Sequence, residues 1–148
     1  EMSASLVGSE MCIRDRHYFM DYAEELLQKL SGEYQIYIVT NGTAHVQKGR
    51  IASAGIRDYV EDVFISEEIG VNKPSKEYFD RCFERIPDFD RNEAVVIGDS
   101  LTSDILGGIN AGVRTIWFHK KESQNETEII PDYEITDLRE LPDLLKKL

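Results

Sequence analysis

Short apolar runs alternate along this chain with segments in which apolar residues recur every three or four positions. Apolar runs of three to five residues, many of them β-branched, are typical of strands buried on both faces of a parallel sheet. Such runs lie at 36–39, 63–65 and 94–97, and further strand candidates lie at 113–117 and, more weakly, near 133–136. Helical spacing is found at 19–30, 44–54, 78–86, 101–109 and 138–147. The pattern predicts strands that alternate with covering helices.

Strands that alternate with helices form right-handed β-α-β units, so we expect a doubly wound, Rossmann-like α/β fold with a parallel sheet. Local signals mark the expected helix ends. Ser75 is a suitable N-cap, and Gly55 and Gly112 directly follow segments with helical spacing. Residues 119–131 are polar and are expected to form a surface loop. A chain of 148 residues is long enough for one domain with a buried core.

The first sixteen residues, EMSASLVGSEMCIRDR, follow neither the helical nor the strand period. They resemble a translated sequencing-adapter fragment of the kind found at the ends of draft gene models. We therefore expect residues 1–16 to be a non-native leader that contributes no element to the fold, and residues 17–148 to form the domain.

Charge and composition narrow the classes of partner. The formal net charge is −11, from 28 acidic and 17 basic residues, and such a field disfavours binding to nucleic acid polymers or anionic membranes. No apolar run approaches the roughly 20 residues of a membrane span, and no signal-peptide pattern is present. Two cysteines, Cys12 and Cys82, do not form a disulfide framework, which favours a reducing compartment. We expect a cytoplasmic protein with a small-molecule partner.

Two polar clusters are suited to binding phosphate. Thr40-Asn41-Gly42 directly follows an expected strand, and its hydroxyl, amide and flexible backbone can donate hydrogen bonds to phosphate oxygens. Lys73, which precedes Pro74, supplies a compact positive charge for a phosphoryl group. Taken separately, the first cluster also fits a capped turn and the second a solvated lysine before a helix.

A third cluster is suited to binding a metal ion. Gly98-Asp99-Ser100 ends another expected strand, and Asp104 follows one helical turn later. Two carboxylates are hard oxygen ligands that fit octahedral Mg²⁺, although Asp99 or Ser100 could also only cap a helix. In open parallel sheets, ligands bind beyond the carboxyl ends of the strands. We therefore predict that Thr40, Lys73 and Asp99 meet in one phosphate- and magnesium-binding site.

The order of these motifs, TNG, then KP, then GDSxxxD, resembles that of the haloacid dehalogenase (HAD) superfamily of phosphohydrolases over nearly all of residues 18–148. Segments 65–70 and 104–112 are similar to the bacterial pyrimidine 5′-nucleotidase branch. The resemblance implies that Thr40 and Asn41, with Gly42, bind the transferring phosphoryl group. It also implies that Lys73 neutralises this group and orients the nucleophile. The implied substrate is a small phosphorylated metabolite, in this branch a nucleoside 5′-monophosphate.

The same resemblance implies that Asp99 coordinates Mg²⁺, so that Lys73 and Asp99 are the expected catalytic residues in this chain. For Asp104 it leaves two roles open: binding the metal, through water, or holding Lys73 in place.

The family's first motif, Asp-x-Asp-x-Thr, and its helical cap are absent from the sequence. The first aspartate of that motif is the nucleophile and the second the general acid and base. Asp88-Phe89-Asp90 does not replace it, because this segment precedes a strand. We therefore expect a partial HAD core that lacks its first strand and is inactive as written. The strands at 36–39 and 94–97 would then be left with exposed edges or would pair with each other.

Two alternatives remain open at the level of sequence. A phospho-receiver or binding module also combines aspartate, threonine, lysine and Mg²⁺, but in a different order along the chain. A HAD phosphomutase or carbon–halogen hydrolase would keep the fold and change the reaction. The paired Asp99 and Asp104 favour phosphate chemistry. The substrate and the oligomeric state stay undefined at this stage.

Overall fold

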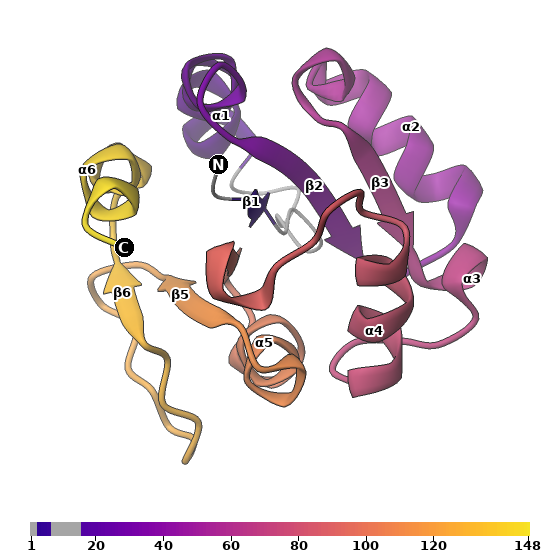
Figure 1. Ribbon diagram of the computed structural model, residues 1–148. Helices are drawn as coiled ribbons and strands as arrows, with labels where there is room; N and C mark the ends of the chain where they lie inside the picture. The colour runs from indigo at the N-terminus through magenta and orange to yellow at the C-terminus, as the bar shows by residue number, and fades with distance from the viewer. Residues whose placement is uncertain (1–2, 7–15) are drawn as a thin grey trace.

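One parallel sheet organises the protein (Figure 1). The computed structural model describes residues 3–6 and 16–148, with side chains from residue 22 onward. Within this part of the chain the strand order is β3-β2-β1-β4-β5-β6. The strands are β1 (Ser3–Leu6), β2 (Gln35–Thr40), β3 (Asp62–Ile65), β4 (Ala94–Gly98), β5 (Arg114–Phe118) and β6 (Tyr133–Ile135). The expected doubly wound α/β fold is confirmed.

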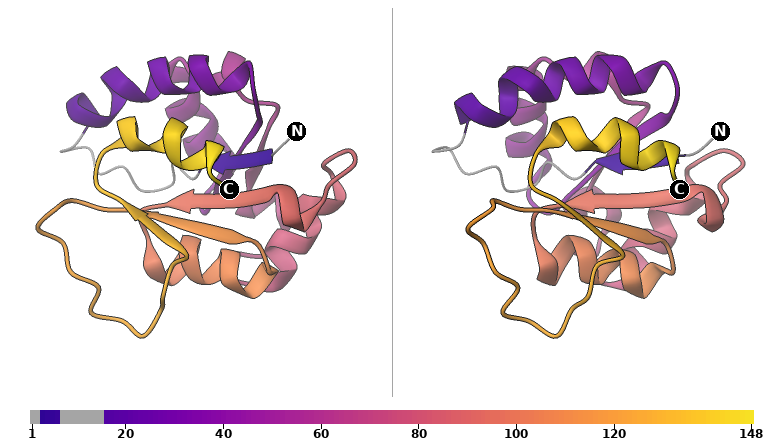
Figure 2. Two further views of the ribbon diagram at one scale, coloured as in Figure 1. Left: turned by 60° about the vertical axis from the view of Figure 1, so that its left-hand side comes forward. Right: turned by 90° about the vertical axis from the view of Figure 1, so that its left-hand side faces the viewer.

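Helices cover both faces of the sheet, and Figure 2 shows α1 and α6 on one side and α5 on the other. The helices are α1 (Arg16–Ser31), α2 (Ala44–Ala54), α3 (Ser66–Ile69), α4 (Lys76–Glu84), α5 (Leu106–Ala111) and α6 (Leu141–Lys146). Four shorter turns are η2 (Arg57–Tyr59), η3 (Arg91–Glu93), η4 (Leu101–Ile105) and η5 (Leu138–Glu140), and η4 is π-helical. The sequence did not predict α3, because four residues carry no helical period.

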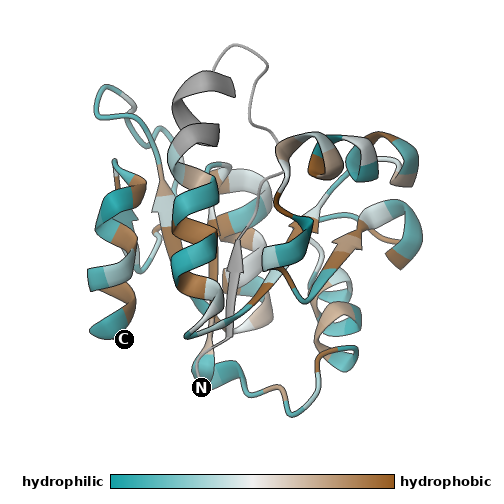
Figure 3. Cartoon of the chain, turned by 90° about the horizontal axis from the view of Figure 1, so that it is seen from above, coloured by the Kyte–Doolittle hydropathy of each residue, from teal (hydrophilic) through white to brown (hydrophobic). Residues whose placement is uncertain are grey.

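Alternate residues of the strands enter two separate cores. Ile36 and Ile38 of β2 join the core under α1 and α6, whereas Tyr37 and Val39 join the core under α4 and α5. The strands are therefore apolar throughout, because successive side chains point to opposite faces and both faces are covered. Figure 3 shows this concentration of hydrophobic residues in the strands, while the helices carry both kinds.

The local helix signals are confirmed. Ser75 caps α4 by accepting a hydrogen bond from the Glu77 N–H, and Gly55 and Gly112 end α2 and α5 with φ values of 69° and 74°. These left-handed conformations favour glycine, which has no Cβ to clash. The segment at 119–131 contains no helix or strand and projects from the sheet as the expected loop (Figure 2).

The expectation that residues 1–16 contribute no element is wrong. Ser3–Leu6 forms β1 in the centre of the sheet, parallel to β2 on one side and to β4 on the other. The edges of β2 and β4 are therefore neither exposed nor paired with each other. Ladder hydrogen bonds join main-chain groups, so a short extended segment can supply them without the apolar pattern of a buried strand.

The packing face of the helix after β4 also differs from the sequence expectation. Helical spacing at 101–109 predicts a single buried face, but Ile109 is 42% exposed while Ile105 is fully buried. The wider π-helical turn η4 shifts the helix phase before α5 begins. In place of Ile109, Gly107 and Gly108 face the neighbouring elements. A Cβ on Gly107 would overlap the Phe79 ring, so their missing side chains allow close packing.

Within the described residues, no helix is both long and apolar enough to cross a bilayer. Cys82 is a buried free thiol, and burial raises its pKa to about 12. Cys12 lies outside the described residues.

Candidate functional site

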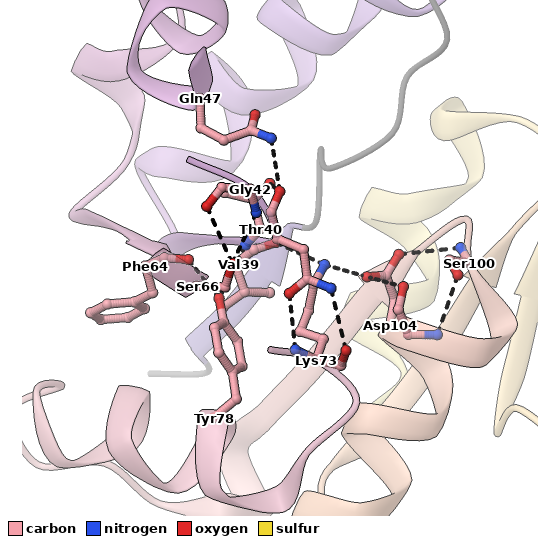
Figure 4. Close-up of polar contacts among 12 residues, drawn as sticks. Val39, Thr40, Gly42, Gln47, Phe64, Ser66, Lys73, Tyr78, Ser100 and Asp104 are labelled. Atoms are coloured by element: carbon pink, nitrogen blue, oxygen red, sulfur yellow. Dashed lines mark hydrogen bonds and ion pairs between the residues drawn. The ribbon is translucent and has the colours of Figure 1, made fainter. Parts of the chain in front are cut away.

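The carboxyl ends of β2 and β4 flank the central strand at one edge of the sheet. Leu6 of β1 pairs with Ile38 on one side and with Ile97 on the other. Thr40 and Asp99 each lie two residues further along, so parallel register brings them to the same level on either side of β1. The remaining polar groups come from the segments that follow β2 and β4 and from the region between β3 and α4. Figure 4 shows them gathered at this edge.

Lys73 enters this edge from the segment between α3 and α4. Its Nζ lies 2.6 Å from Asp104 Oδ1 and donates to the main-chain oxygen of Val39 at 3.2 Å. Both charged side chains are fully buried. A buried ammonium needs a partner of this kind, because desolvation of an unpaired charge is strongly unfavourable. The lysine is thus fixed beside the end of β2, next to Thr40.

Asp104 uses both carboxylate oxygens within the protein. Oδ1 accepts a hydrogen bond from Lys73 Nζ, and Oδ2 accepts one from the main-chain N–H of Ser100 at 3.2 Å. Gly98 makes room for this carboxylate, since a Cβ on Gly98 would overlap it. The sequence left two roles open for Asp104, binding the metal through water or holding Lys73. The structure contains the contact that the second role requires.

Asn41 clamps the main chain of Lys73. Its Oδ1 accepts the Lys73 N–H at 2.9 Å, and its Nδ2 donates to the Lys73 carbonyl oxygen at 3.3 Å. The sequence suggested a direct phosphate contact for this side chain. The structure gives the amide a different partner, the main chain of Lys73, which it holds against the end of β2.

Gly42 likewise has a partner inside the protein. Its N–H donates to Ser66 Oγ at 2.9 Å, and Gln47 donates to the neighbouring Asn41 carbonyl oxygen at 2.8 Å. The φ of Gly42 is 136°, a region that L side chains rarely adopt, and a Cβ there would lie 2.6 Å from Gln47 Nε2. The turn is therefore built around glycine and held by two residues, Ser66 and Gln47, that sequence patterns did not single out.

Thr40 is buried at the end of β2, at 2% exposure. Its main-chain N–H donates to the Tyr78 hydroxyl at 3.1 Å, and its own hydroxyl makes a longer contact of 3.3 Å with the Asn41 carbonyl oxygen. The sequence placed Tyr78 only on the apolar face of a helix, so this polar contact was missed.

Asp99 differs from these residues because it is exposed to solvent. Its main-chain oxygen accepts the indole N–H of Trp117 at 3.0 Å, which fixes the end of β4 against β5. Among the described residues, no group of three or more His, Cys, Asp or Glu side chains is placed to hold a metal ion, at this strand end or elsewhere.

The rejected Asp88-Phe89-Asp90 segment lies before β4, at the opposite edge of the sheet from the strand ends. The Asp90 side chain caps η3, and the Phe89 ring stacks on Phe83 with centroids 4.0 Å apart. These contacts of Asp90 and Phe89 are structural.

The fold and this arrangement define the class of protein. A profile of the haloacid dehalogenase-like hydrolases matches residues 6–112, and the chain belongs to this family. Membership in a hydrolase family favours the phosphohydrolase interpretation over the phospho-receiver alternative.

Three proteins with related sequences show which members of the family this chain resembles. YfnB of Bacillus subtilis, described as a HAD-hydrolase, is 44% identical over 133 residues, 90% of this chain and 57% of YfnB. The pyrimidine 5′-nucleotidase YjjG of Escherichia coli is 41% identical over 84% of this chain and 56% of its own length. The pyrimidine 5′-nucleotidase PynA of Streptococcus pneumoniae is 39% identical over 84% of this chain and 53% of its own length. The chain spans about half the length of these relatives.

Solved structures agree with the fold. A crystal structure of YfnB bound to magnesium superposes with a TM-score of 0.81 and 46% identity over 84% of this chain and 55% of YfnB. A 2-haloacid dehalogenase from Pseudomonas syringae superposes with a TM-score of 0.73 and 29% identity, over 84% of this chain and 51% of the dehalogenase.

Proposed function

We propose that this chain is the core of a magnesium-dependent phosphomonoester hydrolase that acts on nucleoside 5′-monophosphates in the cytoplasm. The observation that carries the proposal is the buried Lys73–Asp104 pair, held between Thr40 at the end of β2 and Asp99 at the end of β4. The pyrimidine 5′-nucleotidase relatives support the substrate class.

The residues at the phosphoryl site have different roles. The Thr40 hydroxyl and the Lys73 ammonium bind its oxygens, and the ammonium offsets their negative charge. Asn41 and Gly42 shape the turn that presents Thr40. Asp104 keeps the ammonium oriented, and its carboxylate offsets the cost of burying the positive charge.

The Asp99 carboxylate would hold Mg²⁺, with Asp104 contributing through water. When bound, the ion supplies a second positive charge that neutralises the phosphoryl oxygens and orients them. The pairing of two carboxylates at one strand end favours phosphate over carbon–halogen chemistry for this chain.

The sequence lacks the Asp-x-Asp-x-Thr motif, so the nucleophile and the acid–base group are absent from the residues printed. We therefore propose that this chain binds phosphate and Mg²⁺ without turnover. Loss of covalent catalysis lowers rates by orders of magnitude.

Two measurements on the purified chain test the proposal. Isothermal titration calorimetry with inorganic phosphate should detect binding in the presence of Mg²⁺, and Thr40→Val should weaken it at least about tenfold through loss of a hydrogen bond to a charged group. Thr43→Val is the matched control, because the exposed Thr43 hydroxyl only caps α2. Hydrolysis of nucleoside 5′-monophosphates should not be detected.

Absence of phosphate binding in the unsubstituted chain would refute the proposed site. Turnover comparable to that of a relative twice as long would instead refute the proposal that the chain lacks its nucleophile.

A further inference from the structure

A buried hydroxyl lies directly behind Thr40. The Tyr78 hydroxyl accepts the Thr40 main-chain N–H at 3.1 Å and donates to the main-chain oxygen of Phe64 at 2.5 Å. Tyr78 is fully buried. One phenol therefore connects the carboxyl end of β2 with that of β3, and Figure 4 shows it pointing into the polar cluster from α4.

The same phenol connects these strand ends to the lysine segment. Tyr78 lies in the first turn of α4, which begins three residues after Lys73 (76 − 73 = 3). Asn41 makes a separate connection, because its side chain holds the Lys73 main chain. Thr40 and Lys73 are thus tied together twice, once through Asn41 and once through Tyr78 and the start of α4.

We propose that Tyr78 is a positioning residue of the phosphoryl site, which holds the Thr40 main chain and the start of α4 so that the Thr40 hydroxyl and the Lys73 ammonium face one phosphoryl group. This inference rests on the proposed function and adds a residue to it. Tyr78 itself does not touch the phosphoryl group, and it acts through Thr40 and the segment that carries Lys73.

The hydrogen bonds of the Tyr78 hydroxyl are independent of the packing of its ring. The Tyr78 ring packs edge-on against Phe79 with centroids 5.2 Å apart, a contact that phenylalanine would keep. The hydroxyl alone satisfies the Thr40 N–H and the Phe64 oxygen together. Burial raises the pKa of Tyr78 far above its ordinary value, so the phenol keeps the proton that it donates to Phe64.

The substitution Tyr78→Phe removes only this hydroxyl. The probe is inorganic phosphate with Mg²⁺, titrated by calorimetry into the full chain at a temperature where circular dichroism shows the variant folded. The dissociation constant for phosphate should rise about tenfold, as expected for a misplaced hydrogen-bonding group. An unchanged constant in the folded variant would overturn the proposal.

Tyr37→Phe is the matched control. Tyr37 is 5% exposed, stacks on Phe64 with centroids 5.6 Å apart, and has no hydrogen-bond partner for its hydroxyl among the described residues. It should leave the phosphate dissociation constant within about twofold of the original value, because it removes a hydroxyl from the same core without touching Thr40.

A second readout separates positioning from general stabilisation. Amide hydrogen exchange measured by NMR should accelerate selectively at Thr40 in Tyr78→Phe, while the amide of Ile38 in the same strand keeps its protection. Equal acceleration along the whole of β2 would show a merely structural role and would overturn the proposal.

If Tyr78→Phe does not fold, p-aminophenylalanine at position 78 replaces it. This side chain keeps a donor for the Phe64 oxygen but offers the Thr40 N–H a poorer acceptor, so the phosphate affinity should fall by a smaller factor. Retained affinity would overturn the proposal for Tyr78 alone. Failure of the unsubstituted chain to bind phosphate would instead refute the proposed function, and this inference with it.

Discussion

The two sides of the candidate site are built differently. On the β2 side, Thr40 and Lys73 are 2% and 4% exposed, and groups from other elements hold both of them. On the β4 side, Asp99 is exposed, and its main-chain oxygen is fixed by Trp117. A group that binds a phosphoryl oxygen benefits from fixed geometry, whereas a ligand of Mg²⁺ must allow the ion to keep water molecules. The difference indicates that the buried residues Thr40 and Lys73 also support the fold, whereas the exposed side chain of Asp99 does not.

The buried ion pair offers the sharpest way to break this comparison. Asp104→Asn keeps the size of the side chain but leaves the Lys73 ammonium buried without its carboxylate. The free energy of unfolding in urea should fall by about 3–5 kcal/mol, as expected when one partner of a buried pair is removed. This is a large part of the 5–15 kcal/mol that typically stabilises a domain.

Two further variants test whether the loss of stability in Asp104→Asn comes from an unpaired buried charge. Asp80→Asn makes the same chemical change in a partly exposed carboxylate that pairs with both Lys76 and Arg91, and it should cost about 1 kcal/mol. The double variant Lys73→Met with Asp104→Asn should recover much of the loss, because no unpaired charge then remains buried. Equal losses at Asp80 and Asp104 would show that burial of the pair does not matter.

Sequence patterns anticipated the parts of this molecule that local chemistry determines. Ser75, Gly55 and Gly112 end or begin helices because capping depends on a few neighbouring residues. Thr40 and Asp99 reach one edge of the sheet because parallel strands that end in polar residues place them there. Lys73 was singled out by a different local signal: a positive charge followed by a proline shortly before an expected helix.

The remaining features depend on contacts between distant segments. Tyr78 was recognised only as an apolar helix position, because its partner Thr40 lies 38 residues away. Ser66 lies in a segment matched only by family resemblance and Gln47 in an expected helix, and neither sequence feature shows that the two residues hold the turn at Gly42. The strand at Ser3–Leu6 was missed because main-chain pairing does not require a periodic sequence.

The turn at Gly42 provides a second test of the tightly held side. Gly42→Ala introduces a side chain at a φ of 136° and against Gln47, so the free energy of unfolding should fall by about 1–3 kcal/mol. Gly49→Ala is the control, since Gly49 lies in α2 with open space around it. There alanine should stabilise the helix by about 0.5–1 kcal/mol. A fall in the free energy of unfolding at both positions would mean that the effect does not arise from the conformation of the turn at Gly42.

Alkaline pH tests the buried core beside Tyr78. Because burial raises the pKa of Cys82 from 9.0 to about 12, the folded state holds a proton that the unfolded state releases. Stability from this thiol is complete below pH 9 and is lost as the pH rises from 9 towards 12. Between pH 9 and pH 10 the loss should be about 1 kcal/mol. Urea unfolding of Cys82→Ala at both pH values should show a correspondingly smaller fall, and an identical fall would exclude the thiol as the cause.

Asp99→Asn should have the smallest effect on the fold and therefore completes the comparison. An exposed side chain at the end of β4 contributes little packing, so the free energy of unfolding should change by less than about 0.5 kcal/mol. The same variant should lose Mg²⁺ binding in a calorimetric titration, because the amide has no negative charge to offer the ion. Asp104→Asn changes the same kind of group five residues later, and there stability should be the first property lost. If Asp99→Asn instead destabilised the protein as much as Asp104→Asn, the two sides of the site would share one structural role, and the division between a buried anchor and an exposed metal ligand would be wrong.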